Sequence, residues 1–201
     1  MNCEEEMTQA ISIDLAVVTI LLNIGHALKA IELCKESLVL LSNKALSIQK
    51  QFCQLIHKEI SYTMFHAYRS VSDHTNALAC GKKLVAILRE GDDTVEEGWL
   101  SILLAQMYRR QNMYAEAKQL LERPIPVKQT TDKRIEACAH GELGTVLHSV
   151  GEYVKAREYY EKALAISMEI GYKSVEGARC GKLGTVFKFL GEYAKARECY
   201  E

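Results

Sequence analysis

Hydrophobic residues recur at helical spacing along most of the chain. In the stretch 141–150, Leu143 and Leu147 are four positions apart, and Gly144 lies on the same side. Such spacing places apolar side chains on one face of an α-helix. A glycine inside a helix costs roughly 1 kcal/mol relative to alanine, so its recurrence at Gly184 predicts that a second helix approaches closely there.

A second helical pattern follows a predicted break at Gly151. Ala156, Tyr160 and Ala163 again recur at i, i+4 and i+7. Glycine suits the left-handed residue that ends a helix. The pattern therefore predicts two antiparallel helices joined by a tight turn. The other predicted helix-ending positions are Gly25, Asn112 and Gly191 after first helices, and Gly91 and Gly171 after second helices.

The helical pair belongs to an internal repeat. Residues 141–161 and 181–201 are identical at 14 of 21 positions, with an offset of 40. Fainter copies occupy 15–35, 62–82 and 102–122. Because one hairpin cannot bury both of its faces, neighbours must stack into a solenoid.

The repeat predicts an all-α fold: a right-handed solenoid of antiparallel helix hairpins, with about nine to ten helices, forming one domain over 1–201. The expected units are approximately 11–45, 58–97, 98–136 and 137–176, with an incomplete unit at 177–201.

Two segments depart from the repeat. Extra residues lie around 42–60, where a cap at Ser42 or Asn43 is expected to start one long helix that ends near Val71. Pro124-Ile125-Pro126 predicts that a second helix ends early, near Arg123, and that a longer loop of altered curvature leads to Lys133.

The last residue, Glu201, falls within a predicted second helix. An apolar edge formed by Leu183, Phe187 and the last helix is therefore expected to be exposed, and the chain is expected to be a fragment of a longer array or a truncated gene product. The alternative is an end that frays or associates with itself.

The repeat resembles the tetratricopeptide repeat family. The signature positions hold Leu143, Gly144, Leu147, Ala156, Tyr160 and Ala163, and in the last unit Leu183, Gly184, Phe187, Ala196 and Tyr200. The resemblance is strong over 141–201, and weaker toward the N-terminus, where Val18 and Phe65 replace the small residue. It implies a protein-binding scaffold whose first helices line a concave groove.

The period of 39 to 40 residues exceeds the common repeat of about 34. Together with the segment 169–179, it resembles the longer units of the LGN/Pins cell-polarity adaptors, and equally the large tetratricopeptide repeat protein 28-like proteins of invertebrates. The sequence does not decide between these relatives.

Two stripes of residues fall on the expected groove. The first comprises His66, Gln106, Thr145 and Thr185, and the second Arg69, Arg109, His148 and Lys188, with Arg110 beside it. The stripes are three residues apart and so are neighbours on one helix face. We expect them to bind a peptide that carries Asp or Glu. The alternative is a solvated surface, because cations favour the last turn of a helix anyway. Lys and Asn residues, with which some relatives hold chaperone tails, are not at the matching positions.

Composition narrows the function further. With 25 basic and 26 acidic residues the net charge is −1, which favours neither a nucleic-acid partner nor an anionic membrane. Seven widely spaced cysteines without a C-x-x-C pair predict reduced thiols and a cytoplasmic location. The histidines are scattered and Cys180-Gly181-Lys182 lacks phosphate-loop spacing, so no enzyme, cofactor or metal site is expected.

Two functional hypotheses remain. The first is a signalling scaffold or adaptor that binds an acidic peptide in the groove. The second is a repeat segment that acts as sensor or spacer in a larger signalling protein.

Overall fold

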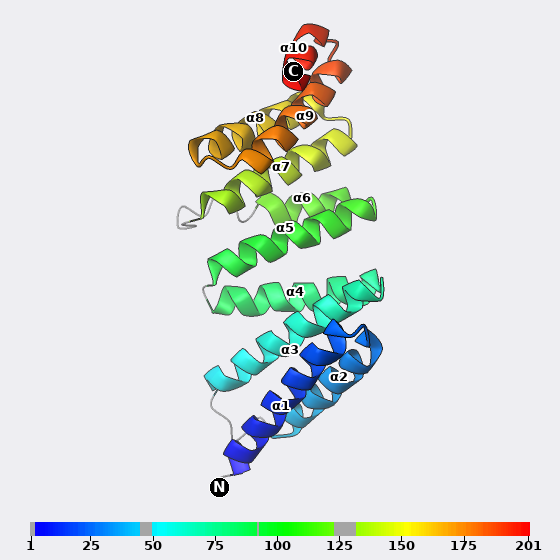
Figure 1. Cartoon of the computed structure of the whole chain (residues 1–201), viewed down its shortest axis with the longest axis vertical. Coiled ribbons are helices and arrows are strands. Elements are labelled where there is room, and N and C mark those ends of the chain that lie inside the picture. Colours follow the sequence, from blue (N-terminus) through cyan, green and yellow to red (C-terminus); the bar gives the residue numbers. More distant parts are fainter. Residues whose placement is uncertain (1–2, 45–49, 92, 123–131) are drawn as a thin grey trace. The chain divides into compact units, whose positions relative to one another are not determined.

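The computed structural model describes residues 3–44, 50–91, 93–122 and 132–201. The described residues form ten helices and no strand (Figure 1), which confirms the all-α fold of antiparallel hairpins. The helices are α1 (Cys3–Asn23), α2 (Ala27–Lys44), α3 (Lys50–Ser70), α4 (His74–Glu90), α5 (Thr94–Arg110), α6 (Tyr114–Glu122), α7 (Lys133–Ser149), α8 (Tyr153–Glu169), α9 (Lys173–Phe189) and α10 (Tyr193–Tyr200).

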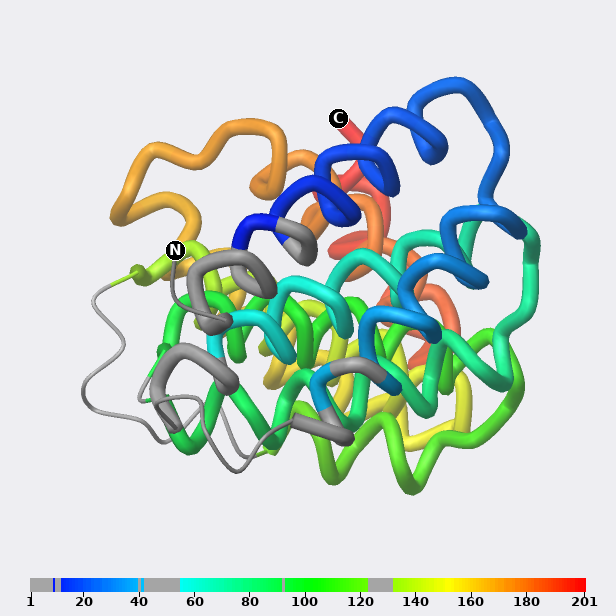
Figure 2. Tube along the Cα trace, turned by 90° about the horizontal axis from the view of Figure 1, so that it is seen from below, coloured from blue at the N-terminus to red at the C-terminus, as the bar shows by residue number. Residues whose placement is uncertain are grey.

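The chain divides into two compact units, residues 1–92 (unit 1) and residues 93–201 (unit 2). In unit 1, the hairpins α1–α2 and α3–α4 stack through contacts of α3 with both α1 and α2. Figure 2 shows α1 running away from the N-terminus and α2 returning beside it. The packing of the second hairpin on the first buries the apolar stripe of α3, where Met64 and Ala67 are 7% and 0% exposed.

Unit 2 stacks three hairpins, α5–α6, α7–α8 and α9–α10, in two layers. The first helices contact one another, α5 with α7 and α7 with α9, and each second helix contacts the first helix that follows it. Among the described residues of unit 2, the second helices α6, α8 and α10 make no comparable contact with one another. The first helices thus form a layer of their own.

A left-handed residue follows the first helix of every hairpin. The φ angle is 82° at Gly25, 84° at Gly151 and 78° at Gly191. Two non-glycine residues, Ser72 and Asn112, take the same place with φ of 60°. All five fall in one register of the repeat, which confirms the turns predicted at the glycines and at Asn112. Ser72 carries no such signal in the sequence.

Gly144 and Gly184 make room for an aromatic ring of the second helix in their hairpins, which confirms the predicted close approach of that helix. A Cβ atom added at Gly144 would lie 2.8 Å from the ring of Tyr160, and one at Gly184 would lie 2.7 Å from the ring of Tyr200. Any larger residue would separate the two helices of the hairpin.

The prediction that a long helix begins at Ser42 or Asn43 is wrong. Ser42 and Asn43 lie in the last turn of α2, and α3 begins at Lys50, with residues 45–49 outside the described part. The physical reason is the stripe of buried residues that continues through α2 to Leu41, which is fully buried. Burial of an apolar face outweighs the capping preference of a Ser-Asn pair. The predicted end of α3 near Val71 is confirmed.

The third hairpin has a short second helix. α6 has 9 residues, whereas α8 has 17, in agreement with a helix that ends near Arg123. The pair Pro124 and Pro126 lies outside the described residues. The chain is helical again from Lys133, where the Asp132 carboxylate caps α7 by accepting a 3.0 Å hydrogen bond from the backbone N–H of Arg134.

The expected apolar edge at the C-terminal end is present on the last helix, α10, but Leu183 and Phe187 are not part of it. Leu183 and Phe187 are buried, with 4% and 8% exposure, because α8 and α10 both pack against α9. Exposed instead are Phe189, Tyr193 and Tyr200. In the described part of the chain, no helix has the length and hydrophobicity needed to cross a bilayer.

Candidate binding face on the first helices

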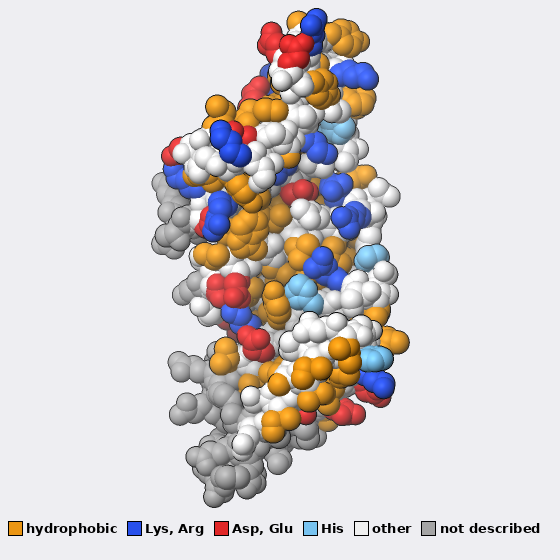
Figure 3. Space-filling view, in the orientation of Figure 1, with side chains coloured by type: hydrophobic (Ala, Val, Ile, Leu, Met, Phe, Trp, Pro, Cys, Tyr) orange, Lys and Arg blue, Asp and Glu red, His pale blue; other side chains and the backbone are white. Residues whose placement is uncertain are grey.

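The surface of α5, α7 and α9 in unit 2 gathers charged side chains on neighbouring helices. We call it the first-helix face, and its members are Arg109, Glu142, His148, Arg179, Lys182 and Lys188. Figure 3 shows Lys, Arg and His side chains along the edge where α5 and α7 end. Because the first helices contact each other directly, residues of successive hairpins are within reach of one extended ligand.

Arg109 on α5 forms an ion pair with Glu142 on α7. The Nε atom of Arg109 is 3.6 Å from Oε2 of Glu142, and the two side chains are 28% and 14% exposed. This distance is too long for a hydrogen bond. Both atoms are buried and have no hydrogen-bond partner among the described residues. The pair is therefore electrostatically attractive, but its polar atoms are unsatisfied.

Arg179 on α9 reaches back over α7. Its guanidinium group packs against Gly141, where any side chain would collide with it. The Nε atom of Arg179 is also buried without a hydrogen-bond partner. Burial raises the pKa of the nearby Cys138 thiol, an effect that the positive charge of Arg179 opposes. Gly141 is thus the feature that lets an arginine of one hairpin lie on the preceding one.

Tyr160 and Thr145 form a buried hydrogen-bonded pair between α8 and α7. The Tyr160 hydroxyl donates to Oγ1 of Thr145 at 3.0 Å, and Thr145 in turn donates to the carbonyl oxygen of Gly141 at 3.0 Å. Burial raises the pKa of Tyr160, and the charges of Arg179, Glu142 and Arg109 all act on it. These three charges are therefore close enough to the buried Tyr160 hydroxyl to affect its pKa.

The two predicted threonines are engaged inside their hairpins. Thr145 is buried. Thr185 bonds the carbonyl of Gly181 at 3.0 Å and lies 3.2 Å from the hydroxyl of Tyr200. Both hydroxyl groups therefore already have partners within their own hairpins.

His148 occupies the position in α7 that Arg109 occupies in α5. Its ring packs edge-on against Tyr153 at 5.4 Å and Phe189 at 5.3 Å, and these two rings stack at 4.8 Å. Burial lowers the pKa of His148, and the positive charge of Lys182 lowers it further. Lys182 is the repeat equivalent of Glu142. At the α7–α9 step, a histidine whose neutral form is favoured thus replaces Arg109, and the cation Lys182 replaces Glu142.

The remaining predicted residues lie as follows. Lys188 and Arg110 are exposed, and Gln106 is half-buried. His66 and Arg69 belong to unit 1, where the guanidinium of Arg69 lies 5.5 Å from the centre of the Phe65 ring. Burial lowers the pKa of His66, as does Arg69. Arg109, His148 and Lys188 thus lie on one layer of helices in unit 2. Arg69 lies in unit 1.

Three residues of the face were missed by sequence analysis: Glu142, Arg179 and Lys182. The repeat offset of 40 makes Glu142 and Lys182 equivalent, and this change of charge was visible in the sequence. Arg179 takes the place of the buried Ala139 of the preceding hairpin. This change from alanine to arginine between equivalent positions was visible in the sequence.

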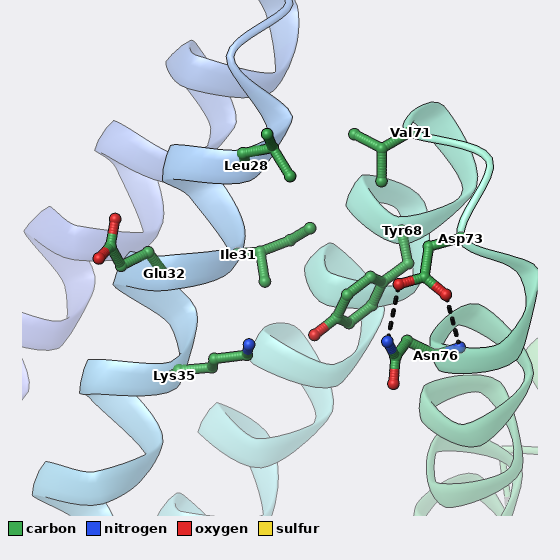
Figure 4. A pocket seen from close by; sticks show the side chains of 8 residues that line it. All are labelled: Leu28, Ile31, Glu32, Lys35, Tyr68, Val71, Asp73 and Asn76. Carbon is green, nitrogen blue, oxygen red and sulfur yellow. Dashed lines mark hydrogen bonds between the residues drawn. The ribbon is translucent and has the colours of Figure 1, made fainter.

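Unit 1 contains a separate hollow of about 470 Å³ between α2, α3 and α4 (Figure 4). Its polar side chains include Asp73 and Asn76. The Asp73 carboxylate accepts hydrogen bonds from the backbone N–H of Asn76 at 3.1 Å and from its side-chain amide at 2.7 Å. This is the N-cap of α4, so these groups stabilise a helix end. The described residues include no group of three or more His, Cys, Asp or Glu side chains arranged for a metal ion.

Comparison with known proteins supports the same fold. The family model for the tetratricopeptide repeat matches residues 135–201. Among solved structures, the apo form of RapI has a TM-score of 0.79 and 16% identity, covering 94% of this chain and 67% of that one. A putative kinesin light chain of Podospora anserina, with nearly identical repeats of this type, has a TM-score of 0.69 and 17% identity, covering 96% and 92%.

A third structure is a signal transduction ATPase with numerous domains from Pyrococcus horikoshii, which has a tetratricopeptide repeat sensor. It has a TM-score of 0.77 and 15% identity, and the match covers 96% of this chain but 30% of that protein. No curated protein matches the sequence. At these identities the structures show the fold alone. The chain therefore has the fold of tetratricopeptide-repeat structures, and its residues 135–201 match the tetratricopeptide-repeat family model.

Proposed function

We propose that this chain is a non-catalytic protein-interaction module that binds an acidic peptide segment on the first-helix face of unit 2. The observation that carries the proposal is the excess of positive charge between α7 and α9. Arg179, Lys182 and Lys188 lie on α9 next to His148 on α7, and the acidic member of the face, Glu142, is paired with Arg109. A ligand carboxylate supplies the negative charge that this step lacks.

The chemistry of Arg179 fits such a ligand. A guanidinium group binds a carboxylate through two parallel hydrogen bonds, and it keeps its charge when partly buried. Because the Nε atom of Arg179 is buried over Gly141, the two terminal nitrogens of the group are the donors proposed for a ligand carboxylate. Lys182 and Lys188 are exposed and add attraction at longer range, which speeds association and makes it sensitive to salt.

The test is a display selection with random peptides of 12 to 15 residues, followed by fluorescence anisotropy on the selected sequences. We expect enrichment of Asp and Glu, and binding that weakens as salt rises from 50 to 300 mM. The double variant Arg179→Gln/Lys182→Gln should weaken binding about tenfold or more, since hydrogen bonds to charged groups contribute about 1.5–3 kcal/mol.

The matched control is Lys155→Gln/Lys162→Gln, which removes two positive charges from α8. It should leave affinity unchanged within about twofold, because those lysines lie on a second helix. Selection of neutral or basic peptides, or equal loss of binding in both double variants, would refute the proposed face.

In the cell, we propose an adaptor or scaffold role in the cytoplasm, of the kind implied by the resemblance to long-repeat adaptors. Support for this compartment comes from the free thiols of Cys34, Cys80, Cys138, Cys180 and Cys199, which suit a reducing environment. Separation of cytosolic from secreted fractions, probed with an antibody against the chain, tests the location.

A second candidate is a sensor segment of a larger signalling protein. It is favoured by the likeness to the archaeal ATPase, whose repeats are described as a sensor and of which this chain spans 30%. Sequencing the complete transcript tests it. A nucleotide-binding domain in the same reading frame would support the sensor function, and its absence would favour the adaptor.

A further inference from the structure

An exposed apolar stripe follows the length of α1. Ile13, Val17, Ile20 and Ile24 recur at i, i+4, i+7 and i+11, and their exposed fractions are 57%, 40%, 58% and 61%. Figure 3 shows hydrophobic side chains along this helix. The core of the hairpin uses the other side of the helix, where Val18 is 1% exposed. The stripe is therefore a second apolar face, and no described element of the chain covers it.

Equivalent positions in the other repeats indicate which kind of surface packs against this face. Val17 and Ile20 are equivalent to Leu183 and Val186 of α9, which are 4% and 0% exposed. α9 packs against the preceding hairpin, α7–α8. A helix with this stripe at this position in the repeat is one that docks on a preceding hairpin.

The same comparison holds at α3. There the positions equivalent to Val17 and Ile20 are Met64 and Ala67, with 7% and 0% exposure, and α3 packs on the hairpin α1–α2. In both units, the stripe is buried wherever a hairpin precedes it. The partner that fits α1 is therefore the open side of a helix hairpin of this same type.

The hairpin α9–α10 presents such an open side. Tyr193 is 69% exposed, whereas its equivalent Tyr153 stacks on Phe189 of the next hairpin. Tyr200 is 58% exposed, whereas its equivalent Tyr160 is 1% exposed. The residues that α9 covers on α7–α8 thus have uncovered counterparts on α9–α10.

We propose that two copies of this chain associate head to tail, with α1 of one copy docked on α9–α10 of the other, as α9 docks on α7–α8 within the chain. By the repeat register, Asn23 and Ile24 of the incoming α1 take the places of Phe189 and Leu190. The aliphatic stripe then covers the exposed tyrosine rings, which contribute large apolar areas on burial.

Charge complements this pairing. The α1 sequence contains four acidic residues and no Lys or Arg, whereas α9 and α10 together contain six basic and two acidic residues. The same lack of basic residues argues against α1 lying on an anionic membrane, where amphipathic helices use Lys and Arg on the polar face. The interface joins two different surfaces, so it leaves one open face at each end of the dimer.

Sedimentation velocity from 5 to 500 µM tests the arrangement with three variants. Ile20→Glu blocks the α1 face, Tyr193→Glu blocks the α10 face, and Met168→Glu is the control, because Met168 is equally exposed at 63% but lies on α8. We expect the wild-type chain and the control to associate as concentration rises, and each blocked variant to stay monomeric. All three substituted side chains are exposed, and circular dichroism checks that helicity is retained.

The decisive sample is an equimolar mixture of the two blocked variants. Each retains one intact face, so the mixture should form a 1:1 dimer that does not grow further. A wild-type chain that stays monomeric over the whole range would overturn the proposal. So would a Tyr193→Glu variant that still dimerises, since it would indicate an α1-to-α1 contact, or a wild-type chain that instead co-sediments with phosphatidylcholine–phosphatidylserine vesicles.

Discussion

The hydroxyl group of Tyr160 on α8 donates a 3.0 Å hydrogen bond to Oγ1 of Thr145 on α7, while its ring lies against the α-carbon of Gly144. The next hairpin repeats the arrangement, with Tyr200 near Thr185 and against Gly184. The glycine sets how closely the two helices approach, and the threonine satisfies the tyrosine hydroxyl that this approach buries. The motif Leu-Gly-Thr followed 15 residues later by Tyr therefore specifies the pairing of helices within a hairpin.

Removing the Tyr160 hydroxyl should destabilise unit 2. In Tyr160→Phe, Thr145 keeps its bond to Gly141 but loses a donor in a buried site. The expected loss is about 1 kcal/mol in the free energy of unfolding, the usual contribution of one hydrogen bond. Urea unfolding followed by circular dichroism measures it. Tyr200→Phe is the control and should cost less, because that side chain is 58% exposed; equal losses would contradict a role for burial.

A methyl group at Gly144 should be costly, although alanine favours helices. The added Cβ would lie 2.8 Å from the Tyr160 ring, which forces the helices apart. Overpacking of this kind typically costs about 1–3 kcal/mol. Gly177→Ala tests the opposite case, because a Cβ there meets nothing within 4 Å, and it should stabilise the chain by up to about 1 kcal/mol. Thermal melting of both variants gives the comparison, and a stabilised Gly144→Ala would refute close packing.

Stability should fall between pH 7 and pH 5 in part through His140. Its side chain is buried, and burial lowers its pKa below the usual 6.5, although Glu136 opposes the effect and Lys162 adds to it. As the pH falls through about 6.5, the unfolded chain binds a proton that the folded chain resists, so the free energy of unfolding decreases, until the folded form also titrates.

Urea unfolding at pH 7, 6 and 5 measures this loss. His140→Gln should show a smaller decrease than the wild-type chain, while His74→Gln, which changes an exposed histidine, should follow the wild-type profile. If His140→Gln loses as much stability on acidification as the wild type, this histidine does not carry the effect.

The sequence predicts the hairpins well because their determinants are local and repeated. Gly151 and Gly191 mark turns, and Gly144 with Tyr160 marks helix pairing, all within one 40-residue unit. The prediction is wrong at Ser42, where burial of Leu41 against other helices decides the helix end. Short-range capping preferences do not contain that information.

The candidate face was predicted only in part for a related reason. The position of Arg109 was identified from the repeat register, but its partner Glu142 comes from the next hairpin. Arg179 was missed because it lies on α9 but packs over Gly141 of α7. Contacts between hairpins depend on residues about 30 to 40 positions apart, which no single repeat displays.

The ion pair between Arg109 and Glu142 predicts opposite effects of its two members on peptide binding. Glu142 competes with a ligand carboxylate for Arg109, so Glu142→Gln should tighten binding of a selected acidic peptide, by about threefold to tenfold, corresponding to roughly 1 kcal/mol. Arg109→Gln removes a cation and should weaken binding by a similar factor. Fluorescence anisotropy at 50 mM salt measures both affinities, and 300 mM salt should reduce the difference, because screening weakens partly exposed charges.

A double variant with both changes should bind close to the wild-type affinity if the two residues act chiefly on each other. If Glu142→Gln weakens binding instead, Glu142 contacts the ligand as a hydrogen-bond acceptor, and the assignment of the face to acidic peptides fails.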